Sequence, residues 1–300
     1  GIDTGRLCWL NAKDAMLHKA SVHTYHTVKR LLYDERKISG AVVSITGHSD
    51  EQVVKASVVV NATGAWAQKM TQGMGTRVQI RPGKGIHLVF VIIATNFAIV
   101  TNAIDGRQIF LFPYQHETWI GTTDDDYYGD LDHIRPTQDE IAYLLQAIQR
   151  IYPKLTQHPM IRIHTGVRNT IHAWGVSEDA LSRRFEAIHH HDYASGFFSM
   201  IGGKLASYRE QAQLTADAVC QYLKHASTCT THLDTLPGAS DIPSAHDLHT
   251  QYKISIDAAQ RLISRHGSIA HNILHAGLKE GNDVIDPYEH VLSSEVRYCL

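Results

Sequence analysis

The chain has 300 residues, a formal net charge of −2 and 43% hydrophobic residues, which is the composition of an ordinary globular protein. A chain of this length can bury a large core and usually forms two domains. Its near-neutral charge offers no general attraction for nucleic acid, because nucleic-acid-binding domains usually carry a basic face. We therefore expect no nucleic-acid partner.

Membrane insertion, secretion and metal binding are disfavoured by the sequence. The longest apolar run, residues 88–94, is far shorter than the roughly 20 residues of a membrane-spanning helix, and no signal-peptide pattern opens the chain. The four cysteines form no CxxC pair, so we expect reduced cysteines and a cytoplasmic location. The histidine run 189–191 points its side chains to alternate faces of an extended segment, so we expect a solvated loop and no metal site.

The N-terminal part of the chain predicts one helix and three strands. Apolar residues recur at helical spacing over residues 4–19. Residues 22–32 and 40–46 have strand patterns on either side of a polar turn. The run 57–64 (SVVVNATG) lacks alternation, which indicates a strand buried on both faces in a parallel or mixed sheet.

From residue 75 to about residue 191 the pattern changes to short strands interrupted by one helix. The strand patterns are HLVFVII, QIFLFPY, TWIGTT and IRIHTGVR. The helix is predicted over residues 138–152, because its apolar residues form a single stripe. This stripe consists of Ile141, Leu144, Leu145, Ile148 and Ile151.

The last third of the chain is predicted to be mainly helical. GFFSMIGGK (196–204) predicts a strand and a glycine turn that lead into an amphipathic helix over residues 205–223. A later helix is predicted to begin after Ser255 and to end at Gly267. The residues that we expect the helix over 205–223 to bury are Leu205, Tyr208, Ala212, Ala216, Val219 and Leu223.

Two glycine-containing turns are suited to ligand binding, although each is common when taken alone. Residues 61–64 (NATG) form a small-residue turn at the end of a buried strand, where a ligand can approach the backbone closely. Gly202 and Gly203 precede Lys204 at the start of a helix, whose free N–H groups favour an anion.

Three basic side chains are candidates for substrate contacts. The guanidinium groups of Arg168 and Arg183 suit phosphate or carboxylate, and His87 follows a glycine-flanked lysine at the start of a strand. A surface arginine and a satisfied core histidine are the commoner explanations of each residue by itself. The three residues therefore indicate a substrate site only in combination with the two glycine-containing turns.

The motifs together resemble the FAD-dependent glycerol-3-phosphate dehydrogenases. The resemblance is carried by VVVNATGAW, PGKGIHLV, WIGTTDDDY, HTGVR, LSR and GFFSMIGGKLASYREQAQLTADAVC, in this order. It covers nearly the whole chain from about Asp3, and the combination of GTTD with GGKL is its most specific part. VNATG alone would fit a broader class of flavin-dependent amine and amino-acid oxidases.

The resemblance implies an α/β (α+β) fold with three parts. We expect residues 1–74 and 192–236 to form a partial, glutathione-reductase-like FAD domain. Residues 75–191 would form an antiparallel-sheet substrate domain, and residues 237–300 a helical C-terminal cap.

The resemblance also implies the site residues. Those expected to face the substrate are His87, Arg168, Arg183 and Lys204. Those expected to contact FAD are Val28 near the adenine, Asn61, Ala62, Thr63, Gly64, Thr122 in the GTTD turn, Gly203, Lys204, Leu205, Ala206 and Ser207. No metal is implied.

Three departures from the family pattern affect these expectations. Asn169 and Thr170 stand where the family has Pro-Leu, which we expect to loosen that loop, and Ala206-Ser207 replace the commoner Thr-Thr. The sequence contains no G-x-G-x-x-G, the motif that binds a dinucleotide diphosphate. Because Gly1 is also not a natural start, we expect that an N-terminal segment has been removed and that the C-terminus is cut as well.

The activity implied by the resemblance is oxidation of sn-glycerol 3-phosphate to dihydroxyacetone phosphate, with hydride transfer to FAD. Electrons would pass on to quinone or to a partner subunit, with the protein peripheral on the inner face of the cell membrane. Two alternatives stay open. One is a flavin oxidase acting on an amino or hydroxy acid, since arginines also suit carboxylates. The other is a non-catalytic chain without bound flavin.

Overall fold

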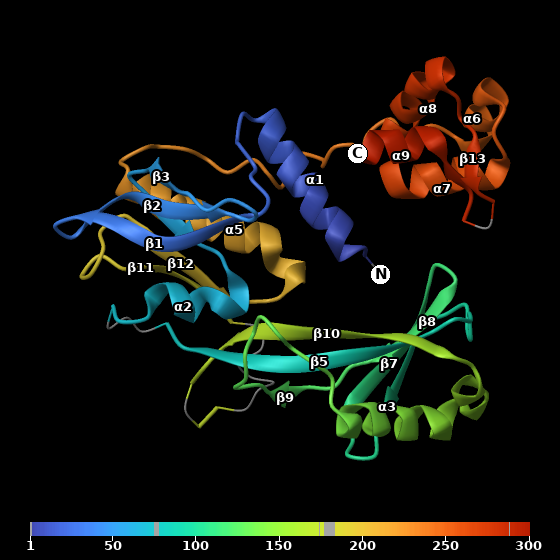
Figure 1. Ribbon diagram of the computed structural model, residues 1–300, viewed down its shortest axis with the longest axis horizontal. Coiled ribbons are helices and arrows are strands. Elements are labelled where there is room, and N and C mark those ends of the chain that lie inside the picture. Colours follow the sequence, from blue (N-terminus) through green and yellow to red (C-terminus); the bar gives the residue numbers. More distant parts are fainter. Residues whose placement is uncertain (1, 75–77, 174, 177–183, 288) are drawn as a thin grey trace. The chain divides into compact units, whose positions relative to one another are not determined.

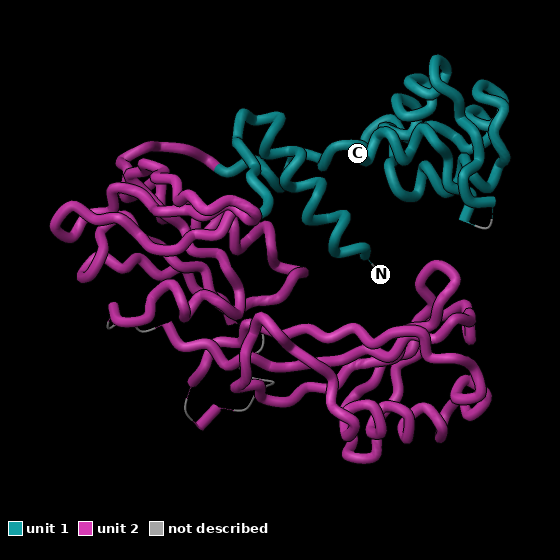
Figure 2. Tube along the Cα trace, in the orientation of Figure 1, with its two compact units in different colours: residues 1–25, 229–300 teal, residues 26–228 magenta. Residues whose placement is uncertain are grey.

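The computed structural model describes residues 2–74, 78–173, 175–176, 184–287 and 289–300. The chain separates into two compact units, one formed by residues 1–25 with 229–300 and the other by residues 26–228 (Figure 2). Mixed helices and sheets build both units, which confirms the α/β (α+β) fold class. The unit of residues 26–228 contains the candidate site.

Two three-stranded sheets belong to the larger unit. The strands β1 (His26–Asp34), β2 (Lys37–Ile45) and β3 (Glu51–Lys55) form an antiparallel meander, and β1 begins four residues later than predicted. Leu31 and Ile38 are buried on its inner face. The other sheet has the order β11-β12-β4.

The sheet β11-β12-β4 is mixed, as predicted for the strand within residues 57–64. Strand β12 (Phe197–Gly202) is buried at every position, pairs in parallel with β4 (Val59–Asn61) and pairs antiparallel with β11 (Phe185–His189). The prediction that the strand of residues 57–64 is buried on both faces was wrong, because Val60 is 42% exposed. Within the described residues β4 pairs with β12 alone and is an edge strand of this sheet.

The prediction of a solvated loop for the histidine run 189–191 was wrong for His189 and His190, whereas His191 lies in a turn and is exposed. His189 ends β11 and stacks on Phe198 with ring centroids 4.2 Å apart. His190 is 4% exposed and shares a 2.9 Å hydrogen bond between its Nε2 and Ser199 Oγ. Pairing of β11 with β12 draws the run into the sheet, which the single sequence did not reveal.

The larger sheet of this unit has the order β10-β5-β8-β7-β6, with β9 paired to β5. Helix α3 (Gln138–Ile151) covers one of its faces (Figure 1). Ile86 and Leu88 of the sheet pack there against Leu144 and Ile148 of the helix, as the predicted stripe requires. The strands are β5 (Ile80–Phe90), β6 (Ile99–Asn102), β7 (Gln108–Tyr114), β8 (Glu117–Gly121), β9 (Asp125–Asp126) and β10 (Met160–Ile171).

The predicted helix over residues 205–223 is present but buries a different face. A 3₁₀ turn (Leu205–Ser207) leads into α5 (Tyr208–Tyr222), which packs on β11 and β12. Leu205 and Leu223 are 45% and 48% exposed, and Ala212 and Ala216 are exposed as well, so the predicted burial of these four residues was wrong. Thr215 is the buried residue of α5, and its hydroxyl donates to the carbonyl of Gln211 at 2.9 Å.

Short helices complete this unit. A 3₁₀ turn (Gly64–Trp66) runs into α2 (Ala67–Thr71) directly after β4. A second 3₁₀ turn (Pro153–Gln157) follows α3 and buries Leu155 in the core beneath the sheet.

The smaller unit consists of α1 (Thr4–Leu17) and the C-terminal helices. Arg6 of α1 donates from Nη2 to His266 Nδ1 at 3.0 Å. Ser255 caps α7 and Gly267 ends it, as predicted. The C-terminal elements are α6 (Ala245–Tyr252), α7 (Ile256–His266), α8 (Ile269–Glu280), β13 (Val284–Asp286), β14 (Val291–Leu292) and α9 (Ser293–Cys299).

Leu144→Ala should lower the free energy of unfolding by about 2–5 kcal/mol, because truncating a fully buried side chain leaves a cavity beneath the sheet. Urea unfolding followed by circular dichroism measures this loss. Gln149→Ala, on the exposed side of the same helix, is the matched control and should change stability by less than about 0.5 kcal/mol. Equal losses in the two variants would contradict this core.

Candidate functional site

Two neighbouring cavities meet at the glycine turn after β12. Gly202 and Gly203 both have positive φ, +74° and +79°, a conformation that side chains rarely adopt. A Cβ at Gly203 would lie 2.6 Å from Gln211 Nε2, so only glycine fits there. Gly203, Lys204, Leu205 and Asn169 line both cavities, which makes this turn the wall that they share.

The first cavity is an elongated, mainly apolar groove of about 650 Å³ between the ends of β4 and β12 and the start of α5. Of the residues predicted from the sequence, Ala62, Gly64, Gly203, Lys204 and Leu205 line it. Its remaining lining residues are Val60, Asn169, Met200, Gly202, Tyr208, Gln211, Ala212, Thr215, Ala216 and Val219. The exposed positions of β4 and α5 therefore face one common groove.

The NATG turn is held from behind by a buried polar network. Asn61 Nδ2 donates to Ala67 O at 3.0 Å and to Ser199 Oγ at 3.2 Å, while Asn61 Oδ1 accepts from Thr63 Oγ1 at 2.7 Å. His190 closes the network at Ser199, and its burial, followed by the charge of His189, lowers its pKa to about 4. Asn61 and Thr63 thus hold the backbone of the turn.

Gly64 opens the turn toward the groove. It has a φ of +59°, and a Cβ placed there would meet no atom within 4 Å. A ligand in the groove can therefore approach the backbone at Gly64 and Ala62 without a steric barrier.

The second cavity, of about 480 Å³, is polar and lies between β10, the start of β5 and the glycine turn. Arg168 and Lys204 line it together, as predicted for a substrate site. Its other lining residues are Arg81, Gly83, Asp124, Asp126, Asn169, Thr170, Gly203 and Leu205.

Arg168 is bonded to the GTTD turn. Its Nη1 lies 2.8 Å from Asp124 Oδ1, and its Nη2 donates to Thr122 Oγ1 at 3.1 Å and to Thr123 O at 3.3 Å. Thr122, predicted to lie near the flavin, is therefore a direct neighbour of the predicted substrate arginine. Asp124 was not predicted as a site residue, because its contact depends on how the turn folds back onto β10.

A buried ion pair supports the same turn from the α3 side. Lys84 Nζ lies 2.8 Å from Glu140 Oε2, and both side chains are more than nine-tenths buried. Burial raises the pKa of the Glu140 carboxyl, but the hydrogen bonds from Lys84 and Thr137 outweigh burial and hold the pKa below its usual range. Thr123 Oγ1 accepts from Ile86 N at 3.1 Å, which ties the turn to β5.

His87 lies on the sheet face opposite α3. His87 is the cross-strand partner of Gly121 in β8 and of His164 in β10. Arg168 lies on the same face, four residues after His164 along β10. The His87 ring is half-buried and makes no hydrogen bond to another described residue. Burial lowers its pKa, and the nearby charges of Arg168 and His164 lower it further. His87 is therefore a neutral imidazole with its polar atoms available, not a satisfied core histidine.

The family model described as FAD dependent oxidoreductase (DAO) matches residues 1–209 of this chain. The chain belongs to this family. Among solved structures, the glycerol-3-phosphate dehydrogenase from Bacillus halodurans complexed with FAD is 28% identical, has a TM-score of 0.79 and covers 92% of this chain and 56% of that one. The L-proline dehydrogenase from P. horikoshii, at 19% identity and a TM-score of 0.53, shares the fold.

Glycerol-3-phosphate dehydrogenases are among the similar proteins. Subunit A1 of the anaerobic enzyme of Haloferax volcanii is 28% identical, and the match covers 100% of this chain and 53% of the relative. The aerobic enzyme of Bacillus subtilis is 32% identical over 74% of this chain and 40% of the relative. The chain thus spans about half the length of these relatives.

The residues of this DAO-family chain fit the ring end of a flavin. The groove is mainly apolar, has a volume of about 650 Å³ and is bordered by open backbone at Gly64 and by the glycine turn, which suits a flat aromatic cofactor. Ala62, Gly64, Gly203, Lys204 and Leu205 are the residues that would hold it. The sequence has no G-x-G-x-x-G, so the fit concerns the flavin ring and not the diphosphate.

The other predicted residues of this family member have different positions. Val28 is 39% exposed on β1 and lines neither cavity, and Ala206 is exposed in the 3₁₀ turn. Ser207 Oγ donates to Lys204 O at 3.0 Å, which stabilises the start of α5. Arg183 lies outside the described residues.

Asn169 tightens the site, so the expectation of a loosened loop was wrong. Asn169 and Thr170 lie within β10, where they pair with Pro82 and Arg81. Asn169 Nδ2 also donates to Gly202 O at 3.2 Å. The departure from Pro-Leu therefore adds a hydrogen bond between β10 and the glycine turn.

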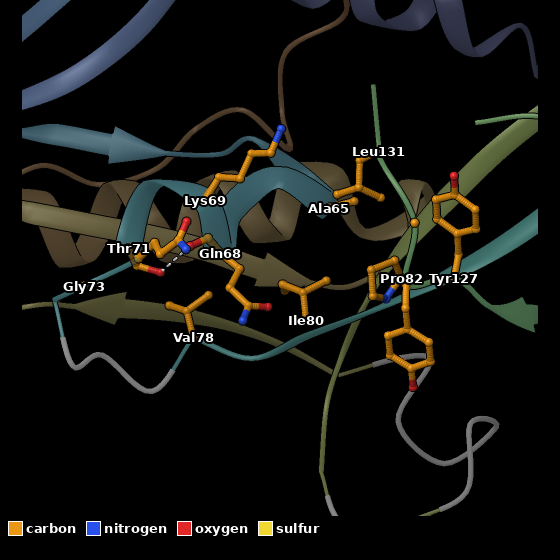
Figure 3. A pocket seen from close by; sticks show the side chains of 13 residues that line it. Ala65, Gln68, Lys69, Thr71, Gly73, Val78, Ile80, Pro82, Tyr127 and Leu131 are labelled. Atoms are coloured by element: carbon orange, nitrogen blue, oxygen red, sulfur yellow. Dashed lines mark hydrogen bonds between the residues drawn. The ribbon is translucent and has the colours of Figure 1, made fainter. Parts of the chain in front are cut away.

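A third cavity, of about 550 Å³, lies between α2 and residues 127–131 and contains none of the predicted site residues (Figure 3). Lys69 at its rim is paired with Asp132 at 2.9 Å. Among the described residues, no three histidine, cysteine or acidic side chains form a group that could hold a metal ion.

Glu140→Gln should lower the free energy of unfolding by about 3–5 kcal/mol at neutral pH, because it leaves the Lys84 ammonium buried without its partner. Urea unfolding measures the loss, and Asp139→Asn, exposed in the same helical turn, is the matched control.

The free energy of unfolding at acidic pH provides a second test of the ion pair between Lys84 and Glu140. Because the folded-state pKa of Glu140 is lowered, its stabilising contribution is present at neutral pH and is lost as the pH falls through that value. The gap between wild type and Glu140→Gln should therefore narrow in acid. A gap that stays constant from neutral to acidic pH would contradict the role of the carboxylate charge.

Proposed function

We propose that this chain carries the substrate and flavin-ring site of an FAD-dependent glycerol-3-phosphate dehydrogenase. The observation that carries the proposal is the meeting of the two cavities at Lys204, where a cationic, glycine-lined pocket joins an apolar groove. Such a pair of spaces suits a small phosphorylated substrate held against a flat aromatic cofactor. The names of the relatives support the same substrate.

Oxidation of sn-glycerol 3-phosphate to dihydroxyacetone phosphate removes a proton from the C2 hydroxyl and a hydride from C2. FAD, when bound, accepts the hydride. His87 is the proposed base, because its half-buried imidazole is neutral near pH 7 and makes no hydrogen bond to another described residue. The charge of Arg168 disfavours the imidazolium, so the proton leaves His87 readily after each turnover.

The phosphate is proposed to bind between Lys204 and Arg168. Lys204 is exposed at the shared wall and makes no ion pair with another described residue, so its charge is available to an anion. Arg168 presents a guanidinium that is already oriented by Asp124 and the turn. Arg183 is proposed to add a third cation, in keeping with the family motif LSR.

The remaining expectations are proposals of the same kind. Residues 1–74 with 192–236 would form the FAD domain, residues 75–191 the substrate domain and residues 237–300 the cap, with Val28 and Thr122 among the FAD contacts and Asn61, Thr63, Ala206 and Ser207 shaping the turns. Electrons are proposed to pass to quinone or a partner subunit at the inner face of the membrane. Among the described residues, no helix is long and apolar enough to cross a membrane.

The protein, mixed with FAD and freed of excess cofactor, should retain a visible flavin band that bleaches on anaerobic addition of glycerol 3-phosphate. Absorption spectroscopy measures both steps. Bleaching by an amino acid, with no response to glycerol 3-phosphate, would contradict the proposed substrate and favour the oxidase alternative.

Arg168→Ala should raise the KM for glycerol 3-phosphate about 10- to 100-fold, as loss of a charge-assisted contact predicts, and leave the KM for glycerol nearly unchanged. Steady-state kinetics with an artificial electron acceptor measures both values. Arg150→Ala is the matched control, because Arg150 is an exposed arginine of α3 that lines neither cavity. Equal effects of Arg168→Ala on both substrates would refute the phosphate contact.

A further inference from the structure

The sheet face that carries His87 holds a second imidazole directly opposite it. His87 of β5 and His164 of β10 are cross-strand partners. Side chains at directly opposed positions of antiparallel strands share a face, with Cβ atoms about 5 Å apart. The His87 ring is half-buried, whereas the His164 ring is exposed to solvent.

Trp119 fixes the position of the His164 ring. Its indole lies 4.5 Å from the His164 ring and 6.1 Å from the His87 ring, measured between centroids. The indole Nε1 donates to Glu117 Oε2 at 3.0 Å, and Arg162 binds both oxygens of the same carboxylate while its guanidinium covers the indole at 5.6 Å. His164 is therefore packed against an anchored platform beside His87.

The other groups around His87 determine whether its surroundings favour the neutral or the charged imidazole. From β10, His164 and Arg168 face it. The rings of Trp119 and Phe112 face it from β8 and β7. The carboxylates of Glu117, on β8, and of Asp124, in the GTTD turn, are each bonded to an arginine. The charged neighbours with a net effect on His87 are therefore cationic.

We propose that His164 is a positioning residue that keeps the His87 imidazole neutral and ready to accept a proton. Two imidazoles so close are not easily charged together, so a charge on His164 disfavours a charge on the half-buried His87 ring. Arg168 acts on His87 in the same sense from further along β10. The catalytic use of a neutral His87 rests on the proposed function, whereas the coupling between the two rings does not.

Two substitutions of opposite sign test the coupling without flavin or substrate. His164→Gln removes the second titrating charge, and His164→Lys makes that charge permanent. Nitrogen-15 NMR of histidine-labelled protein, with the His87 signals assigned from His87→Gln, reports the fraction of charged His87 against pH. Near its midpoint the ratio of neutral to charged His87 should fall about threefold in His164→Gln and rise above wild type in His164→Lys.

His158→Gln is the matched control, because His158 is an exposed histidine in the segment that leads into β10. It should leave the titration of His87 unchanged. Loss of packing on Trp119 would move the titration in the same direction in both His164 variants. Shifts of the same direction, or no shift in either, would overturn the proposal.

The pH profile of flavin bleaching tests the proposed function separately from the coupling between His87 and His164. In the FAD-loaded protein, the acidic limb of the pH profile for bleaching by glycerol 3-phosphate should move to higher pH in His164→Gln and to lower pH in His164→Lys. A wild-type protein that does not respond to glycerol 3-phosphate contradicts the proposed function but leaves the NMR result in force. NMR shifts of opposite sign with an unmoved kinetic profile would overturn the catalytic role of this coupling.

Discussion

The antiparallel register between β5 and β10 determines which of their side chains lie on the candidate substrate face. It aligns Gly83 with Arg168 and His87 with His164. Because side chains alternate in a strand, a slip of one residue would send His87 into the core and Leu88 to the open face. The packing of Leu88 and Ile86 against α3 therefore fixes the site as firmly as it fixes the fold. The arrangement of the proposed site residues on β5 and β10 thus follows from burying the other side of β5.

The ion pair between Lys84 and Glu140 links that core to the site chemistry. A buried pair of charges gains little over an apolar pair, since desolvation offsets most of the Coulomb attraction. The pair mainly holds α3 and the GTTD turn in place, because Glu140 also caps α3 through Thr137 and contacts Thr123 of that turn. The turn that orients Arg168 is thus bonded to a helix on the opposite face of the sheet.

The sequence was sufficient for elements whose signals are local. Strand and helix patterns located α3 and the strands β5, β7, β8 and β10, but not the short strands β6 and β9. The motifs located Arg168 and Lys204, which the structure places in one cavity. It was insufficient where the outcome depends on a distant partner. The histidine run enters a sheet because β11 pairs with β12, and Leu205 stays exposed because it borders a groove. The pairing of His164 with His87 is likewise a property of register, which no local pattern encodes.

Charge pairing in the polar cavity bears on how phosphate and carboxylate are distinguished. Arg81 is matched by Asp126 and Arg168 by Asp124, so Lys204 is the unmatched cation among the described lining residues. A carboxylate can be neutralised by Lys204 alone. A phosphate monoester carries about −1.5 to −2 charges near pH 7 and needs more. If the cavity binds phosphate as proposed, full use of Arg168 requires sharing or displacing Asp124, and the strength of this ion pair would set the preference for dianions over monoanions.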